Sequence, residues 1–483
     1  MPDRIQFESV IGLEIHAQLL TETKIFCGCS AKFGSQPNTH VCPVCLGLPG
    51  ALPVLNKVAV EYAIRAGLSL GCTIQPVSVF ARKNYFYPDL PKGYQISQYE
   101  QPLATSGRVK YQTDGEMFSV GITRVHLEED AGKSLHEGLP DSSRSTHLDF
   151  NRSGVPLIEI VTDPDLRSGT AAADFFGHLR AILKTVGIND GNMEEGSLRC
   201  DANVSVRPVG VSTLGVKVEV KNINSFKFLR RAIEHEFKRQ KNRIIKNETI
   251  QQETRLWDDA AGLTVSMRTK EEAHDYRYFP DPDLLPLEIS SEWVTAVRDA
   301  LPELPDVRQS RFVEQYKLTV RESKLLTQSI DLADYFEATA KASGNAKLAS
   351  NWIMGEVSRK TKEANLSIAS FIVNPESLAG LISLIDKGII NNSVAKKVFD
   401  RMYETGDSAD EIVQLEGLVQ IDDIEELDAI VSIVIESNLD AVESYRLGKK
   451  SALGFLVGQV IRKTNGKANP RLVSDLVKNA LEK

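Results

Sequence analysis

The hydrophobic periodicity of this chain changes near residue 290, and this change limits the folds that it can adopt. Before that point several stretches alternate polar and apolar residues with period two, as half-buried strands do, and helical stretches at 56–70, 170–186 and 226–243 interrupt them. Beyond it the spacing is mostly helical. We therefore predict an α+β fold. It consists of a β-rich mixed domain with an antiparallel sheet at 1–291, an all-α connector at 292–405 and a small all-α tail at 406–483.

Length and composition agree with a folded protein of several domains. The 483 residues are 42% hydrophobic and 25% charged, which is enough for more than one core. The longest run without a polar or charged side chain, 41–55, has 15 residues and three prolines, so it is no membrane span. Residues 1–10 contain no apolar signal core, and we expect a cytoplasmic protein that has no membrane partner.

Charge is distributed unevenly along the tail. The formal net charge of the chain is −8, which gives no overall basic field to attract nucleic acid. Residues 406–443 contain 12 Asp and Glu and no Lys or Arg, whereas residues 444–483 contain nine Lys and Arg against two Asp and Glu. The basic end suits a polyanionic partner, and a solvated helix face is the alternative.

Four of the six cysteines lie within 19 residues. They form two close pairs, Cys27 with Cys29 and Cys42 with Cys45. In a cytosolic chain such a cluster favours metal over disulfides, and four thiolates suit a closed, structural, tetrahedral zinc site. Unmetallated buried thiols are the alternative, and we interpret the isolated Cys72 and Cys200 in that way.

The run HLEEDAGKS at 126–134 ends like a phosphate-binding loop but does not match one. The glycine that such a loop needs five residues before its second glycine is Leu127 here, and Glu128, Glu129 and Asp130 would repel phosphate. Carboxylate oxygens are instead the ligands that Mg²⁺ prefers. No GxGxxG stretch supports a dinucleotide fold either.

Further carboxylates recur on the polar faces of the predicted strands, beside cations and amides. The acids are Glu14, Asp149, Asp201 and Glu219. The accompanying donors are His16, Arg199, Asn203, Lys217, Lys221 and Asn222. Phosphoryl transfer needs this mixture, with acids for Mg²⁺ and cations for phosphoryl oxygens. The alternative is the solvent-facing side of a sheet.

Two loop segments mix aromatic, basic and proline residues. They are RKNYFYPDLPKGYQISQ at 82–98 and DYRYFPDPDL at 275–284. Such segments can stack on bases and contact phosphates. Rigid loop packing is the alternative.

Several long motifs resemble the B subunits of the tRNA-dependent amidotransferases, which act on glutamyl-tRNA(Gln) and aspartyl-tRNA(Asn). They are VIGLEIHAQL (10–19), the segment at 82–98, HLEEDAGKS, PLIEIVTDPD (156–165), MEEGSLRCDANVSVRP (193–208), EVKNINSF (219–226) and DYRYFPDPD. The resemblance runs essentially end to end and includes GFLVGQVIRKTNGKANP (454–470) in the tail.

The resemblance implies one component of a heterotrimer. Its amidase-type glutaminase component releases ammonia from glutamine, and a small third component wraps the contact between the other two. The B component binds the misacylated tRNA, phosphorylates its side-chain carboxylate with ATP and Mg²⁺, and lets ammonia displace the phosphate. Its fold is a cradle domain, a helical domain and a tail domain that grips the tRNA. Whether tRNA(Gln), tRNA(Asn) or both are used does not follow from the sequence.

Matching positions carry the expected site residues over to this chain. Glu14 and His16 correspond to the metal-binding motif, Glu129 to a further Mg²⁺ ligand with Glu128 as the alternative, and Glu219 to a catalytic partner. The expected substrate and phosphate contacts are Lys83, Lys133, Arg199, Asp201, Asn203 and Lys221. The four clustered cysteines correspond to a zinc knuckle that some members have and others lack. The expected tRNA contacts are Lys449, Lys450, Arg462, Lys463, Lys467 and Arg471.

Two other functions stay open on the sequence alone. One is a non-catalytic RNA-binding module, and the other is a stand-alone carboxylate–amine ligase acting on a small acid. The recurring acids favour catalysis over binding alone, and the basic tail favours a polyanionic substrate over a small molecule. No Ser/His/Asp or Cys/His set points to a side-chain nucleophile, and activation through an acyl phosphate needs none.

Overall fold

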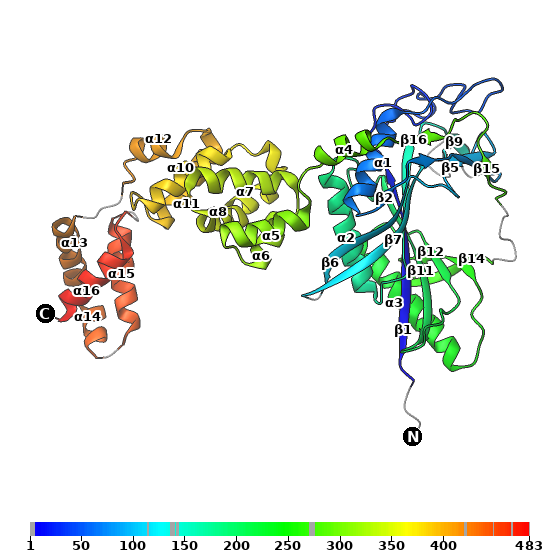
Figure 1. Ribbon diagram of the computed structural model, residues 1–483. Helices are drawn as coiled ribbons and strands as arrows, with labels where there is room; N and C mark the ends of the chain where they lie inside the picture. The colour runs from blue at the N-terminus through cyan, green and yellow to red at the C-terminus, as the bar shows by residue number, and fades with distance from the viewer. Residues whose placement is uncertain are drawn as a thin grey trace. The chain divides into compact units, whose positions relative to one another are not determined.

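The computed structural model describes residues 5–113, 115–135, 141, 144–269, 276–419, 423–447, 449–464 and 467–482. It divides into two compact units, Met1–Asp306 and Val307–Lys483. The first is rich in β-strands and the second is helical, which confirms the predicted α+β class (Figure 1).

A nine-stranded sheet forms the centre of the first unit. In spatial order its strands are β14 (Leu263–Thr269), β13 (Glu253–Asp258), β12 (Val218–Lys221), β11 (Leu198–Pro208), β1 (Phe7–Gln18), β10 (Pro156–Thr162), β7 (Glu116–Glu129), β6 (Ala104–Thr113) and β2 (Thr73–Ile74). Neighbours are antiparallel except β12 and β13, which are parallel. The predicted strands at 10–19 and 199–207 are β1 and β11, and they pair with each other.

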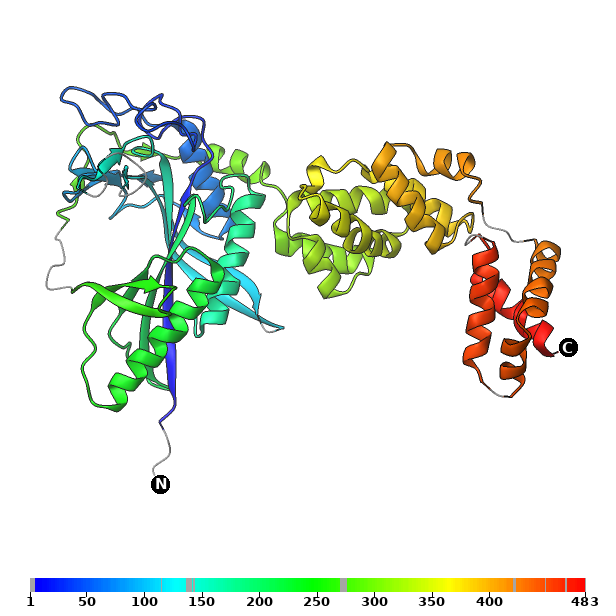
Figure 2. The same cartoon turned by 180° about the vertical axis from the view of Figure 1, so that it is seen from behind.

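Three helices pack against this sheet: α1 (Lys57–Ser69), α2 (Gly169–Thr185) and α3 (Phe226–Ile245) (Figure 2). Each begins at a polar residue whose side chain caps its free backbone N–H groups: Asn56, Ser168 and Ser225. Period-two alternation then separates the two faces of β1. Leu13, Ile15 and Ala17 are buried in the core with the helices, whereas Glu14, His16 and Gln18 point to the other face.

Short strands lie beside the large sheet. A three-stranded sheet has the order β15 (Phe279–Pro280), β4 (Ala81–Asn84) and β5 (Tyr94–Ser97). Two further pairs are β3 (Val77–Ser78) with β16 (Leu287–Glu288) and β8 (Lys133–Leu135) with β9 (His147–Asp149). Pairing of β15 with β4 brings the two aromatic-basic segments together although almost 200 residues of chain separate them. Helix α4 (Ser291–Asp299) packs on α1.

The second unit is entirely helical in its described residues. Its elements are α5 (Pro305–Tyr316), α6 (Val320–Leu326), α7 (Ile330–Ser343), α8 (Ala346–Trp352), the π-helix η2 (Ile353–Val357), α9 (Ser358–Glu363), the 3₁₀ helix η3 (Ile368–Ser370), α10 (Pro375–Asp386), α11 (Asn392–Thr405), α12 (Ala409–Leu415), α13 (Ile424–Ser437), α14 (Leu439–Arg446), α15 (Ser451–Lys463) and α16 (Pro470–Glu482). Helix α5 starts two residues before the unit boundary.

Three separate hydrophobic cores accompany these elements. One belongs to the first unit, a second joins α5–α12, and a third joins α13–α16. Val297 of α4 lies in the first core and Ile412 of α12 in the second. Each of these helices follows a predicted boundary, at 291 or 405, but packs in the core that precedes it. The three-domain division itself stays a prediction. No helix among the described residues is long and apolar enough to cross a bilayer.

Candidate active site

A row of polar side chains crosses the open face of the large sheet. Strand register pairs His126 of β7 with Glu159 of β10, Glu159 with His16 of β1, and His16 with Arg199 of β11. Directly opposite residues of neighbouring strands point to the same face, so four strands contribute to one site. The site therefore depends on the register of the sheet and on no single loop.

His16 lies at the centre of this row. Its Nε2 is 3.3 Å from Glu159 Oε2, 3.7 Å from Glu128 Oε1 and 3.8 Å from Glu14 Oε1. Two sets of three residues place their ligand atoms within 4.8 Å of one another: His16 with Glu128 and Glu159, and His16 with Glu14 and Asp201. Imidazole nitrogen and carboxylate oxygens at this spacing fit a hard divalent cation.

The charges in this cluster are strongly coupled. Burial lowers the pKa of His16, but hydrogen bonding to Glu159 and the nearby charges of Glu128, Glu159 and Glu14 outweigh it and raise the pKa to about 9. Burial, and then the charge of Glu159, raise the pKa of Glu14. Burial raises the pKa of Glu159, but His126 and His16 outweigh it and lower that pKa overall. Carboxylates thus crowd one another here, and a bound cation would relieve the repulsion.

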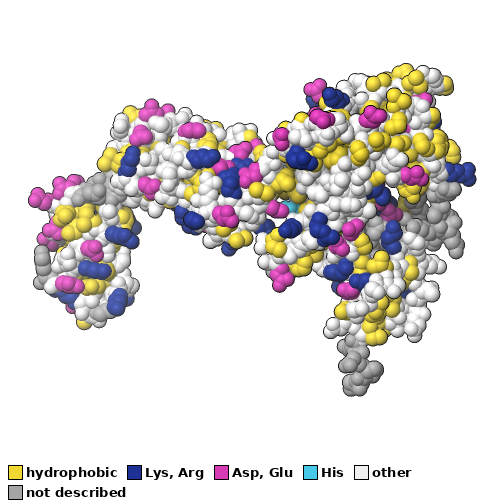
Figure 3. All heavy atoms as spheres, viewed as in Figure 1, with side chains coloured by type: hydrophobic (Ala, Val, Ile, Leu, Met, Phe, Trp, Pro, Cys, Tyr) yellow, Lys and Arg dark blue, Asp and Glu magenta, His cyan; other side chains and the backbone are white. Residues whose placement is uncertain are grey.

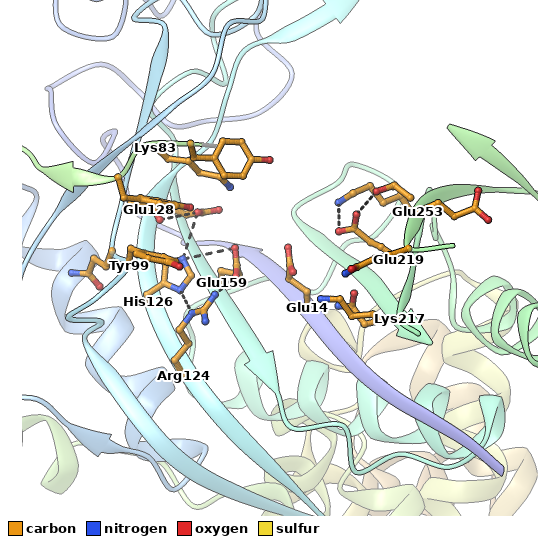
Figure 4. A pocket seen from close by; sticks show the side chains of 18 residues that line it. Glu14, Lys83, Tyr99, Arg124, His126, Glu128, Glu159, Lys217, Glu219 and Glu253 are labelled. Atoms are coloured by element: carbon orange, nitrogen blue, oxygen red, sulfur yellow. Dashed lines mark hydrogen bonds and ion pairs between the residues drawn. The ribbon is translucent and has the colours of Figure 1, made fainter. Parts of the chain in front are cut away.

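A cavity of about 430 Å³ opens next to the cluster (Figure 4). The residues around it are Glu14, Lys83, Ser97, Gln98, Tyr99, Arg124, His126, Glu128, Glu159, Asn203, Lys217, Glu219, Lys221, Gln252, Glu253, Thr254, Tyr276 and Tyr278. Its walls thus combine acids with four cationic side chains and three tyrosines. That volume is within the usual range for small-molecule sites.

On one side of the cavity a lysine joins two acids. Lys221 Nζ lies 2.6 Å from Asp201 Oδ2 and 3.1 Å from Glu219 Oε1, and Thr254 donates to Glu219 Oε2 at 2.7 Å. Asn203 is opposite Glu219 in the register. These contacts hold Glu219 and Lys221 in fixed positions at the cavity wall.

Gln98 presents a fixed donor to the cavity. Its Oε1 accepts hydrogen bonds from the backbone N–H groups of Leu103 (3.2 Å) and Leu127 (3.0 Å). Because both partners are donors, the orientation of the amide is determined. Its buried Nε2 has no acceptor within the described part of the chain, and an oxygen of a bound substrate or water would satisfy it.

The structure brings most of the expected site residues together. Glu14, Lys83, Asn203, Glu219 and Lys221 line the cavity, and His16 and Asp201 belong to the candidate metal sets. Arg199 instead pairs with Asp130 at 2.9 Å, next to His16 in the register. Lys133 is exposed on β8 opposite Asp149 and is not among the described residues around the cavity.

Glu129 lies on the other face of β7, away from the cluster. Its carboxylate forms an ion pair with Lys92 and accepts a hydrogen bond from the backbone N–H of Ile96 at 2.9 Å. Strand alternation gives the reason: residues 126 and 128 share one face, and residue 129 points to the other. The preference for Glu129 over Glu128 at the metal cluster therefore does not agree with the structure, and the alternative, Glu128, occupies that place.

Several residues of the site were missed by sequence reasoning. They are Glu159, His126, Arg124, Glu253 and Thr254. Glu159 carried a signal, because it is the one charged residue of the strand PLIEIVT. His126 carried another, because it is two residues before Glu128 on a strand. Nothing in the sequence indicated that β10 pairs with β1.

The cysteine cluster lies at a separate place in the first unit. All four sulfur atoms lie within 4.8 Å of one another, and Cys42 Sγ is 3.8 Å from Cys45 Sγ. Four sulfurs at about 2.3 Å from a tetrahedral zinc ion lie about 3.8 Å from one another. The fully buried Lys24 donates to the carbonyls of His40 (2.8 Å) and Phe150 (3.2 Å). The hydrogen bond from Cys27, then that from the backbone N–H of Cys42 and the charge of Lys24, outweigh burial and lower the pKa of Cys45 to about 4. These thiols can hold a structural metal ion.

Comparison with known proteins gives consistent results over nearly the whole chain. Residues 9–295 match the family model described as the GatB/GatE catalytic domain, and residues 334–481 match the one described as the GatB domain. A protein of Thermodesulfovibrio yellowstonii that is named as the B subunit of an aspartyl/glutamyl-tRNA(Asn/Gln) amidotransferase is 54% identical over 473 residues, which are 98% of this chain and 99% of that protein. Proteins of the same name from Thermoanaerobacter sp. and Geotalea daltonii are each 52% identical, covering 99% of this chain and 100% of each relative.

Proposed function

This chain belongs to the family of B subunits of the tRNA-dependent amidotransferases, which are ligase-type enzymes, and from that premise we propose the reaction of its cavity. With ATP and Mg²⁺ it phosphorylates the side-chain carboxylate of Glu-tRNA(Gln), Asp-tRNA(Asn) or both. Ammonia then replaces the phosphate and gives Gln-tRNA(Gln) or Asn-tRNA(Asn). The observation that supports this most is the cavity that joins a candidate metal cluster with four cations and three tyrosines.

The metal cluster fits the cation that this reaction needs. His16, Glu128 and Glu159 would hold one Mg²⁺, and Glu14 and Asp201 offer further oxygens beside it. When bound, Mg²⁺ neutralises negative charge on the phosphates of ATP. The residues of this chain bind and orient it, and no step requires a covalent bond to the protein.

The cationic side chains suit the phosphoryl group that is transferred, whose oxygens carry negative charge. Lys83, Arg124, Lys217 and Lys221 line the cavity opposite or beside the acids. In the first step an oxygen of the substrate carboxylate forms a bond to the γ-phosphorus as the bond to the bridging oxygen of ADP breaks. These cations compensate the charge on the phosphoryl oxygens during that exchange.

The second step needs access for ammonia and exclusion of water. Ammonia attacks the carbonyl carbon of the acyl phosphate, inorganic phosphate leaves with the bonding electrons, and the proton that the nitrogen loses passes to that phosphate. A walled cavity protects the intermediate from hydrolysis. We propose that ammonia comes from an amidase-type glutaminase partner that is joined to this chain by a small third partner in a heterotrimer, because the relatives are named as subunits.

The experiment that tests this function compares ATP hydrolysis with charged and uncharged tRNA. The chain is assembled with its two proposed partners in the presence of ammonium, and glutamyl-tRNA(Gln) is compared with the same tRNA after deacylation. We expect the charged tRNA to stimulate ATP cleavage by on the order of 10-fold or more, because only it carries the carboxylate that accepts phosphate. Equal stimulation by both would favour an RNA-binding scaffold, and activity without tRNA would favour a ligase acting on a small acid.

The tail helices support a contact with a polyanion. Asp and Glu gather on α13 and Lys and Arg on the α15 side of the same bundle (Figure 3). The predicted tRNA contacts Lys449, Lys450, Arg462, Lys463 and Arg471 are exposed, and Lys467 is half-buried. In the described part of the chain none of these six forms an ion pair. We propose that they bind the tRNA backbone.

Removal of the tail bundle tests this assignment. A deletion of 424–483 takes out one separate hydrophobic core and leaves α12 in the core where it packs. We expect the KM for tRNA to rise by on the order of 10-fold and kcat at saturating tRNA to change little, because phosphate contacts supply binding without taking part in the chemistry.

Two double variants of the tail test the same assignment without removing the bundle. Arg462→Ala with Lys463→Ala should weaken tRNA binding and reduce its dependence on salt, whereas Glu425→Ala with Glu426→Ala on α13 should not. An unchanged KM for tRNA in the deletion variant would show that the basic residues of the tail form only a solvated helix face and do not bind tRNA.

A further inference from the structure

Tyrosine rings form a continuous series of contacts that ends in the cavity. Ring centroids are 5.9 Å apart for Tyr87 and Tyr85, 6.0 Å for Tyr85 and Tyr276, and 6.1 Å for Tyr276 and Tyr278. These three contacts are edge-to-face, whereas Tyr278 and Tyr99 are stacked in parallel with centroids 4.1 Å apart and planes inclined by 4°. Three of the five rings, those of Tyr99, Tyr276 and Tyr278, line the cavity.

The segments that carry these rings are tied to one another. Asn84 of β4 donates from its backbone N–H to the carbonyl of Tyr276 at 3.0 Å and from Nδ2 to the carbonyl of Arg277 at 2.9 Å. Lys83 Nζ lies 5.0 Å from the ring centroid of Tyr276. The rings are therefore held in place before any ligand arrives, which reduces the conformational entropy that these segments lose on binding.

Tyr99 is the most open ring of the three. It is 51% exposed, while Tyr276 and Tyr278 are half-buried. One face of Tyr99 rests on Tyr278, and that leaves an aromatic surface backed by a second ring. Such a surface is typical of proteins that stack unpaired bases, since every base has a π-face.

We propose that Tyr99, supported by Tyr278, is a stacking platform for an unpaired adenine, and that this base is the 3′-terminal adenine of the aminoacyl-tRNA. The inference rests on the proposed function, because it assumes that the side-chain carboxylate reacts at the metal cluster. In an aminoacyl-tRNA the amino acid is esterified to the ribose of the terminal nucleotide. The terminal base is therefore connected to the reacting carboxylate through the amino-acid side chain, the ester and one ribose.

The position of Tyr99 fits this short connection. Ser97, two residues before it, donates to Glu128 Oε2 at 3.2 Å, and Tyr99 and His126 both line the cavity (Figure 4). The adenine of ATP is the other base that the reaction brings in. The paths from the two bases to the reacting atoms are of similar length, but the path in ATP runs through the negatively charged α- and β-phosphates. The ester and ribose that lead to the terminal adenine carry no negative charge, so a platform that follows Ser97, the hydrogen-bond partner of the Glu128 carboxylate, suits the terminal nucleotide better.

The test measures which substrate loses affinity when the platform is removed. Two variants are assembled with the two proposed partners: the single variant Tyr99→Ala and the double variant Tyr99→Ala with Tyr278→Ala. The double variant is needed because the single change uncovers the second ring. We expect the double variant to raise the KM for aminoacyl-tRNA by on the order of 10- to 100-fold, which corresponds to the loss of one stacked base. The KM for ATP should stay within about twofold, and Tyr99→Phe should restore the tRNA affinity because a phenyl ring also stacks.

Tyr87→Ala is the matched control. Tyr87 is 48% exposed and belongs to the same series of rings, but it is not among the described residues around the cavity. It should leave the KM for tRNA unchanged. A second readout replaces the terminal adenine of the tRNA by 2-aminopurine, whose fluorescence falls when it stacks. We expect quenching with the wild type and with Tyr99→Phe and none with the double variant.

Two outcomes would overturn the proposal. A rise confined to the KM for ATP would assign the platform to the adenine of that nucleotide, and unchanged KM values together with unchanged quenching would show that the rings serve loop packing. Both are distinct from a failure of the proposed function. In that case the wild type itself would show no extra ATP cleavage with charged tRNA.

Discussion

Glu128→Gln and Glu159→Gln will each lower charged-tRNA-dependent ATP cleavage by about 100-fold or more, while Glu129→Gln will retain most of it. Glu128 and Glu159 approach His16 Nε2 to 3.7 and 3.3 Å and are buried, so each change removes an anionic ligand from a site where water has little access. Glutamine preserves the size of the side chain. The loss is therefore one of charge and not of packing.

Glu129→Gln is the informative comparison, because Glu129 directly follows Glu128 in the chain but its side chain lies on the opposite face of β7. It leaves the buried ammonium of Lys92 without its carboxylate, so we expect the melting temperature to fall even though ATP cleavage persists at lower temperature. Glu61→Gln on α1, where Glu61 pairs with Arg65 at 2.7 Å, controls for the same substitution at the surface. Loss of ATP cleavage in Glu129→Gln with full activity in Glu128→Gln would reverse the assignment of the cluster.

Titration with Mn²⁺ in place of Mg²⁺ adds a readout that does not depend on the rate of the chemical step. Binding of Mn²⁺, followed by its paramagnetic effect on water protons, should weaken in Glu128→Gln and Glu159→Gln and remain in Glu129→Gln. A cation bound equally well by all three variants would place the metal elsewhere in the cavity.

Local patterns were enough to predict the faces of individual strands. Period-two alternation placed Glu14 and His16 on the polar side of β1, and the structure has them there. Alternation counted from His126 also separates Glu128 from Glu129, which the motif resemblance alone does not do. The α+β class followed from the same periodicities, because half-buried strands and amphipathic helices differ in period.

The pairing of strands that are distant in the chain could not be predicted from the sequence. Glu159 meets His16 because β10 lies next to β1, and about 140 residues of chain separate the two. Similarly, Tyr99 and Tyr278 stack because β15 pairs with β4. Both aromatic segments were recognised from composition, although the first ends at Gln98, one residue before Tyr99. Their meeting at one cavity depends on long-range pairing that no local pattern encodes. Asp275 of the second segment lies outside the described residues.

Removal of the metal from the cysteine cluster, or of one of its ligands, should have the largest effect on stability. Cys45→Ala deletes the most buried of the four thiols, and we expect it to abolish stoichiometric zinc and to lower the melting temperature by about 5 °C or more. The reason is that binding of a metal by four thiolates from a long loop is coupled to the folding of that loop. Without the metal ion, the thiolates that compensate the buried ammonium of Lys24 are no longer held together, and this destabilises the segment around Lys24.

Cys72→Ala is the control, because Cys72 is a buried thiol outside the cluster. It should retain one zinc per chain and lose only the stability expected of a small change in the core. Treatment of the wild type with a strong chelator should reproduce the loss in Cys45→Ala and have no further effect on that variant. Wild-type protein that carries no zinc as purified, and whose melting temperature does not change with chelator, would instead identify the cluster as four unmetallated thiols. Because the cluster is separate from the cavity, ATP cleavage measured well below the melting temperature should survive in Cys45→Ala, which distinguishes a structural metal from a catalytic one.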